Sequence, residues 1–291
     1  VENIITVINY IENNLTEKLN LSSIAMGVGY SKYHLHRMFV ETVGLSIHDY
    51  VQRRQLTESA KLLVFSDKSI LEISLIAGYE SQQAFTGVFK EMYKLTPADY
   101  RAAEEFYPLQ LPICLCEEPI KMDFTKDDIR FATLSDAKDW MELMRLAIDG
   151  YPCLKEEEYL ENLSRYIEKK QALILRDEGM AIGILAFSKE TGNIDFWAVH
   201  PQYRGLGMEE MFLNKLAEEL LRGKEISLTT YREGDKADTG HRKTYLSLGF
   251  AERELLTEYG YPTQRFVLPT RERENASCKR EGENISCGKR K

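Results

Sequence analysis

Two stretches of this sequence repeat one pattern, and that pattern decides the fold. Residues 21–39 read LSSIAMGVGYSKYHLHRMF, and residues 69–90 read SILEISLIAGYESQQAFTGVFK. Each has a small residue where two helices can cross, a glycine that permits the positive φ of a tight turn, and a serine that can cap the next helix. These are Ala25, Gly29 and Ser31 in the first stretch and Ser74, Gly78 and Ser81 in the second. The sequence therefore predicts two helix-turn-helix units in tandem, joined by a helix over residues 46–64.

The second helix of each unit has an apolar face and a polar face. Leu35, Met38 and Phe39 in the first unit, and Phe85 and Phe89 in the second, have the spacing that buries one side of a helix. The polar side chains on the other side suit phosphates and base edges, with Arg and Lys as donors to guanine and Gln as a partner for adenine. These candidate DNA contacts are Lys32, Tyr33, His34 and Arg37, and Gln82, Gln83, Thr86 and Lys90.

Residues 5–102 resemble the DNA-binding domain of the AraC/XylS family. Lys94 stands where family members often have glycine, a departure from which we expect little functional effect. The resemblance implies an all-α module that lays two recognition helices into successive major-groove segments, with double-stranded promoter DNA as its partner and RNA polymerase as a second candidate partner. The matching residues are Gly29-Tyr30-Ser31, Leu35-x-x-x-Phe39, Ile70-x-x-Ile73, Gly78-Tyr79, Phe85-x-x-x-Phe89 and Thr96-Pro97-x-x-Tyr100-Arg101.

The overall charge of this helical region does not by itself favour DNA. Residues 1–110 hold 10 Lys and Arg against 13 Asp and Glu, and the whole chain has a formal net charge of −8. Attraction to phosphates must then come from local clustering of basic side chains. The alternative interpretation is a helical bundle that serves as a docking module without a DNA role.

From Ile129 onward, short β-rich runs alternate with amphipathic stretches. This alternation is typical of an α/β or α+β domain built around one mixed β-sheet. The expected strands cover residues 129–132, 172–175, 182–187, 194–199, 226–231 and 265–268, and the expected helices cover 137–149, 156–169, 208–222 and 241–248.

Residues 127–269 resemble the GNAT acyltransferase fold. The strongest match is IDFWAVHPQYRGLGM over residues 194–208, where a strand leads through a glycine-rich turn into a helix, and a second match is YLSLGF over 245–250. Glycines in such a turn let backbone amides approach a pyrophosphate, and the helix dipole adds attraction. The resemblance implies that acetyl-CoA or another acyl-CoA binds at Val199, Arg204, Gly205, Leu206, Gly207 and Met208.

Glu209 departs from the family's phosphate-binding pattern, Arg/Gln-x-x-Gly-x-Gly/Ala. In register, that pattern falls on Arg204, Gly207 and Glu209; a register shifted by two residues falls on Gln202, Gly205 and Gly207. A carboxylate at the start of the helix would repel a pyrophosphate, at a cost on the order of a few kcal/mol in a partly desolvated site.

Two residues match catalytic positions of the GNAT family. Tyr245 matches the general acid that protonates the departing thiolate, and Asp195 matches a carboxylate that deprotonates the amine through water. The alternative is that Tyr245 packs against a cofactor or the core and that Asp195 is a solvated strand residue. Asp238 and His241 stand where many enzymes of the family have Asn and Ala.

These patterns predict a multidomain chain. We expect an AraC-type DNA-binding domain over residues 1–103, a linker over 104–125, a GNAT-like domain over 126–269 and a disordered, charged tail over 270–291 that is too polar to bury a core. Five cysteines without framework spacing fit a reducing cytoplasm, and Cys114-x-Cys116 lacks the further ligands of a metal site. No apolar run is long enough for a membrane span, so we expect no membrane partner.

The sequence thus predicts a transcription regulator whose GNAT-like domain senses a small-molecule effector, either an acyl-CoA or an amine. The alternative is a bifunctional protein that regulates transcription and also transfers an acetyl group from acetyl-CoA.

Overall fold

The computed structural model describes residues 2–115, 123–147 and 156–269 of the chain. The expected tail over residues 270–291, part of the expected linker with Cys116, and the end of the expected helix over 137–149 lie outside the described residues. Among the described helices, none is long and apolar enough to cross a membrane.

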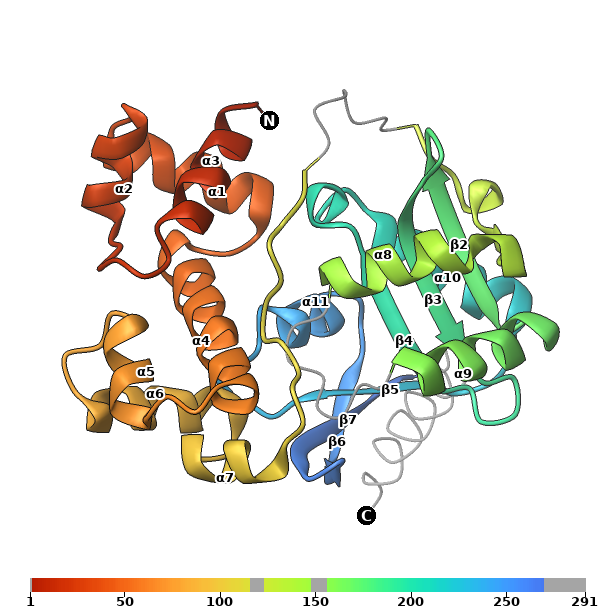
Figure 1. Ribbon diagram of the computed structural model, residues 1–291. Helices are drawn as coiled ribbons and strands as arrows, with labels where there is room; N and C mark the ends of the chain where they lie inside the picture. The colour runs from red at the N-terminus through yellow and green to blue at the C-terminus, as the bar shows by residue number, and fades with distance from the viewer. Residues whose placement is uncertain (1, 116–122, 148–155, 270–291) are drawn as a thin grey trace, which may run out of the picture.

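The N-terminal part of the chain is helical, as the sequence predicts (Figure 1). From residue 21 onward, the helices of this part begin at polar caps, which satisfy backbone N–H groups that have no partner inside the helix. The Oγ atoms of Ser31 and Ser81, for example, accept from the N–H groups of His34 and Ala84. The helices are α1 (Glu2–Asn13), α2 (Leu21–Val28), α3 (Lys32–Val43), α4 (Ile47–Phe65), α5 (Ile70–Ile76), α6 (Gln82–Tyr93) and α7 (Pro97–Ala103).

Helix α4 joins the two helix-turn-helix units because it contributes to both of their cores. Its N-terminal residues, with Tyr50 and Val51, pack with Phe39 of α3 in the first core. Its C-terminal residues, with Leu56 and Leu63, pack with the aromatic residues of α6 in the second core. The same helix therefore fixes how the two units lie relative to each other.

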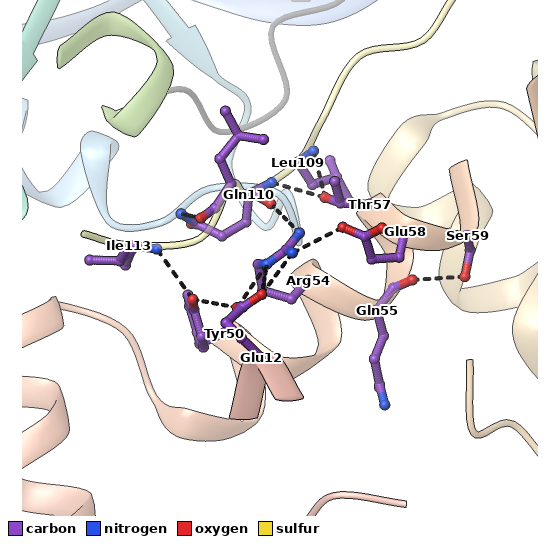
Figure 2. A network of polar contacts seen from close by, with 11 residues as sticks. Glu12, Tyr50, Arg54, Gln55, Thr57, Glu58, Ser59, Leu109, Gln110 and Ile113 are labelled. Carbon is purple, nitrogen blue, oxygen red and sulfur yellow. Dashed lines mark hydrogen bonds and ion pairs between the residues drawn. The ribbon is translucent and has the colours of Figure 1, made fainter. Parts of the chain in front are cut away.

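A buried network of polar contacts connects α4 to α1 and to the extended segment that follows α7 (Figure 2). The side chain of Arg54 is only 4% exposed; it donates to both carboxylate oxygens of Glu12, to Glu58 at 2.9 Å and to the carbonyl of Gln110 at 3.0 Å. The Tyr50 hydroxyl also donates to Glu12, at 2.7 Å. Burial, with Glu12 adding to it, raises the pKa of Tyr50 well above its ordinary value, so this hydroxyl remains a donor.

The C-terminal part of the chain contains strands and helices. Its helices are α8 (Ala137–Ala147), α9 (Glu156–Glu168), α10 (Met208–Lys215) and α11 (His241–Ser247), with short helical turns η1 (Lys126–Asp128), η2 (Leu134–Asp136), η3 (Pro201–Tyr203) and η4 (Leu216–Leu220). Its strands are β1 (Arg130–Phe131), β2 (Ala172–Asp177), β3 (Met180–Phe187), β4 (Ile194–Val199), β5 (Ile226–Tyr231), β6 (Ala251–Glu258) and β7 (Tyr261–Leu268).

Strands β2 and β3 are buried on both faces. Leu173, Leu175 and Leu185 pack in a core with α10, whereas Ile174 and Ile184 pack on the opposite face with α8 and α9. Because successive side chains of a strand point to opposite faces, a strand between two helical layers is apolar throughout. This explains the continuous apolar runs that mark these strands in the sequence.

The expectation of one mixed β-sheet is wrong. Within the described residues, the paired strands are antiparallel and form two sheets, ordered β1-β2-β3-β4 and β5-β7-β6. Strands β4 and β5 are joined through α10 and meet in a parallel bridge between Asn193 and Ser227, after which no ladder forms between them. Strand β6, which the sequence analysis missed, is mostly exposed and therefore lacks the apolar alternation of a core strand.

The two parts of the molecule lie against each other along α4 and the extended segment (Figure 1). The segment binds α4 because the backbone N–H groups of Leu109 and Gln110 donate to the hydroxyl of Thr57 at 3.0 and 3.1 Å. On the other side, the guanidinium of Arg53 donates to the carbonyls of Leu109 and Ala237, both at 3.1 Å. Arg53 is 2% exposed, so these contacts hold a charge inside the interface.

Arg54→Ala should lower the free energy of unfolding by about 3–5 kcal/mol, because it leaves Glu12 and the Gln110 carbonyl without their buried partner. Urea unfolding followed by circular dichroism measures this loss. Lys61→Ala, an exposed change on the same helix, is the control and should stay within about 0.5 kcal/mol. A loss below about 1 kcal/mol for Arg54→Ala would contradict the role given to this network.

Candidate nucleic-acid interface and ligand pocket

Both predicted turns form as the sequence indicates. Gly29 and Gly78 have φ angles of +76° and +79°, the left-handed region that a Cβ atom disfavours. Ala25 and Ser74 are buried where the two helices of each unit cross. The turn glycines thus permit the left-handed backbone that leads into α3 and α6.

The predicted outer edges of α3 and α6 are accessible to solvent. Leu35, Phe39, Phe85 and Phe89 are fully buried, and Met38 is half-buried, so the inner faces are those that the sequence predicts. On the outer faces, Lys32, Tyr33, His34, Arg37, Gln82, Gln83 and Lys90 are exposed, and Thr86 is half-buried. The second part of the molecule does not cover these edges, and their contacts with DNA stay predictions.

The end of α6 is connected to the second part of the molecule through Lys94. This residue closes α6 in a left-handed conformation, with φ +60°, which costs a residue with a Cβ atom on the order of 1 kcal/mol. Its ammonium group pairs with Asp235 at 2.8 Å and lies 5.6 Å from the centre of the Tyr261 ring. The expectation of little functional effect at Lys94 therefore missed a contact between distant parts of the chain.

A cavity of about 480 Å³ lies between β4 and β5. It forms where these strands separate, and side chains of α9, α11 and the β6–β7 hairpin line it as well. Small-molecule sites in proteins are commonly clefts of roughly 300–1,000 Å³ lined by aromatic side chains and a few polar groups. The cavity has the size and the lining of such a site.

Aromatic rings form a continuous series along one side of the cavity. Trp197 stacks on Tyr245 with ring centres 5.9 Å apart, and Tyr245 stacks on His241 at 6.1 Å. The series continues from His241 to Tyr231 at 6.3 Å and from Tyr231 to Tyr261 at 5.9 Å. Since Lys94 lies over Tyr261, this series ends at the C-terminus of α6.

Two carboxylates line the same cavity. Asp195 accepts from the hydroxyl of Tyr166 at 2.8 Å and from the side-chain amide of Asn193 at 2.7 Å. Glu258 accepts from the hydroxyl of Thr263 at 2.9 Å. Burial and the Asp195 carboxylate raise the pKa of Tyr166 well above its ordinary value, so it stays a neutral donor.

The structure brings the two predicted catalytic residues, Tyr245 and Asp195, to this one cavity. The sequence analysis missed Tyr166, Tyr231 and Glu258, which also line it. These three residues come from α9, β5 and β6, and no sequence spacing connects them. The series of aromatic rings could not be predicted from the sequence either, because its members become neighbours only after the strands have paired.

The glycine-rich turn lies between β4 and α10. Gly205 and Gly207 have positive φ angles and open space at their Cβ positions, and Leu206 is exposed. Val199 and Met208 are buried in the core, and Arg204 donates from Nε to the carbonyl of Val199 at 3.3 Å. Burial lowers the pKa of His200 to about 4, so this imidazole is neutral at pH 7 and supplies no positive charge to the turn.

Glu209 lies half-buried in the first turn of α10. Burial raises the pKa of its carboxyl, while its own backbone N–H and the charge of Arg204 oppose that rise. The helix start that would face the pyrophosphate of coenzyme A therefore already holds an acidic group. As it stands, this turn fits an anionic pyrophosphate poorly.

Glu209→Gln should strengthen coenzyme A binding by about tenfold, because it removes a repulsion of roughly 1–2 kcal/mol between partly desolvated charges. Isothermal titration of the full chain with acetyl-CoA measures the change, and Glu209→Gly should act in the same direction. Glu210→Gln, at the exposed neighbour, is the matched control. Equal affinities for Glu209→Gln and the unsubstituted chain would show that the repulsion does not govern this site.

Comparison with known proteins adds a family match for the helical part. Residues 24–103 match the family model described as a helix-turn-helix domain. The right origin-binding protein of Escherichia coli is 37% identical over 129 residues, which are 44% of this chain and 43% of that protein. The probable transcription factor PqrA of Proteus vulgaris is 40% identical over 103 residues, 34% of this chain and 84% of PqrA.

The chain thus spans less than half the length of the right origin-binding protein. Among solved structures, an acetyltransferase of the GNAT family from Bacillus cereus aligns with a TM-score of 0.38 at 13% identity, over 48% of this chain and 94% of that one. So low a score does not assign the fold of the C-terminal part.

Proposed function

We propose that this chain, which belongs to the AraC family of helix-turn-helix transcription regulators, binds specific DNA sites and changes its DNA affinity when a small molecule occupies its C-terminal cavity. The observation that carries this proposal is the contact of Lys94, at the end of the recognition helix α6, with Asp235 and Tyr261 beside the cavity. Such a contact would connect DNA binding and ligand binding by a direct physical path.

DNA binding is supported by the family and by the accessibility of both outer edges. The edges present donors and acceptors of the kinds that contact phosphates and bases, including Arg37 on α3 and Gln83 on α6. Two such edges on one chain, held by the single helix α4, suit neighbouring segments of one duplex. The family and this geometry together favour a role in transcription regulation over a docking module.

Sensing is supported by the loop between β5 and α11, residues 232–240. Its flanking residues Tyr231 and His241 line the cavity, and its own residues contact the helical part through Asp235 and Ala237. Asp235 also accepts from the hydroxyl of Tyr261, at 3.1 Å. A ligand that moves the aromatic wall would therefore move the partners of Lys94. The contacts of α6 would then differ between the ligand-free and the ligand-bound states, as coupling between two binding sites requires.

A bifunctional protein that also transfers an acetyl group is the second candidate. The presence of Tyr245 and Asp195 in one cavity favours it, since a general acid and a base acting through water would both face the substrate. Glu209 at the cofactor turn weighs against it. Thiol release from acetyl-CoA with candidate amines, lost in Tyr245→Phe, would support this second activity.

Arg37→Ala and Gln83→Ala should each weaken binding to a specific DNA site by about tenfold or more, because each removes a side chain placed to read or hold the duplex. The site is first located by footprinting the purified chain on DNA upstream of its own gene. Gel-shift titration at a fixed salt concentration then gives the affinities. The thermal stability of both variants should be unchanged, since both side chains are exposed.

Lys61→Ala removes an exposed positive charge on α4 that is not among the predicted DNA contacts, and should leave specific binding nearly unchanged. If no genomic fragment is bound specifically even at low salt, the helical part is a docking module and the proposal is wrong.

A further inference from the structure

We infer that the cavity between β4 and β5 takes a hydrophobic organic cation with aromatic groups, rather than an anionic or an acyl-CoA ligand. This inference rests on the proposed function, because it names the class of ligand that the C-terminal part would sense.

The charged groups of the cavity are acidic. Asp195 and Glu258 line it, whereas no lysine or arginine does among the residues that the structure describes. The hydrogen-bond partners of both carboxylates are neutral hydroxyl and amide groups, and neither carboxylate forms an ion pair within residues 2–115, 123–147 and 156–269. Their charges are therefore not compensated by an ion pair; Asp195 is exposed at the cavity and Glu258 is half-buried, so the attraction for a cation is strongest near Glu258, where less water screens the charge.

The uncharged part of the lining also favours a cation. Of the twenty described residues that line the cavity, eight are Phe, Tyr or Trp, although these types make up only 10% of the chain. The faces of aromatic rings carry negative potential and attract organic cations, most strongly for Trp and where water is excluded. Trp197 and Tyr245, stacked on each other, form one such wall.

An anionic ligand would meet the opposite conditions. It would face Asp195 and Glu258 without a lysine or arginine beside it in the described lining, and the neighbouring glycine-rich turn adds Glu209. The hydroxyl of Tyr166, a donor that such a ligand could use, is already bonded to Asp195. A small aliphatic ammonium ion would satisfy the carboxylates but leave most of the aromatic surface without contact.

Tetraphenylphosphonium is a suitable probe because it is an aromatic cation that cannot accept an acyl group, so its binding is independent of any transferase activity. Tetraphenylborate has the same shape and the opposite charge. Titration of each ion into the full chain, followed by calorimetry and by tryptophan fluorescence, should give saturable binding of the cation and at least tenfold weaker binding of the borate. Trp197→Phe should remove most of the fluorescence change, since the other tryptophan, Trp140, is fully buried outside the cavity.

Asp195→Asn and Glu258→Gln should each weaken phosphonium binding about tenfold without a change in melting temperature. Asp127→Asn, which removes an exposed carboxylate away from the cavity, is the control for net charge and should leave the affinity unchanged. Three results would overturn the inference. The chain could bind the borate as tightly as the phosphonium or more tightly, it could fail to bind the phosphonium, or its phosphonium affinity could stay the same in both cavity variants.

Failure of this inference and failure of the proposed function give different results. If phosphonium binds but leaves the DNA affinity unaltered, the inferred ligand class stands and the proposed coupling through the loop is wrong. Specific DNA binding by a chain that does not bind phosphonium rejects the ligand class alone.

Discussion

Two neighbouring arginines in the middle of α4 hold the parts of this molecule together, because a buried guanidinium must find partners for its charge and its donors. Arg54 bonds Glu12 of α1 and the carbonyl of Gln110, so it ties the first helix-turn-helix unit to the extended segment. Arg53 bonds the carbonyls of Leu109 and Ala237, so it ties the same segment to the second part of the chain. The positions of the recognition helices and of the cavity therefore depend on one helix.

The total charge of this mildly acidic helical region does not describe the charge at its exposed edges. Basic side chains such as Arg53 and Arg54 are used inside the protein, whereas the exposed edges carry a few cations among neutral donors such as Gln82 and Gln83. Local placement, rather than total charge, then decides where phosphates are attracted. The loop over residues 232–240 adds a second constraint, because Asp235 binds the residue that ends α6.

Local features of the sequence predicted much of the fold, whereas the cavity needed the tertiary structure. Gly29 and Gly78 mark turns whose conformation depends on neighbouring residues alone, and β4 and β5 have the bounds that their apolar runs indicate. The separation of β4 from β5 after the Asn193–Ser227 bridge is a matter of strand pairing between distant segments, and no local sequence pattern marks it. Lys94 did leave a signal, as a lysine in place of a turn glycine, but its partner Asp235 lies 141 residues further along the chain.

In the proposed function, the cavity and the DNA-binding helices are coupled through Lys94. Coupling between two binding sites is reciprocal, so the direct measurement is DNA affinity with and without saturating phosphonium, together with phosphonium affinity with and without DNA. We expect one common factor in both directions, about fivefold or more, and its loss in Lys94→Gly, which keeps the left-handed turn and removes the ammonium group. Equal DNA affinities with and without the bound cation, or a factor that persists in Lys94→Gly, would contradict the claim.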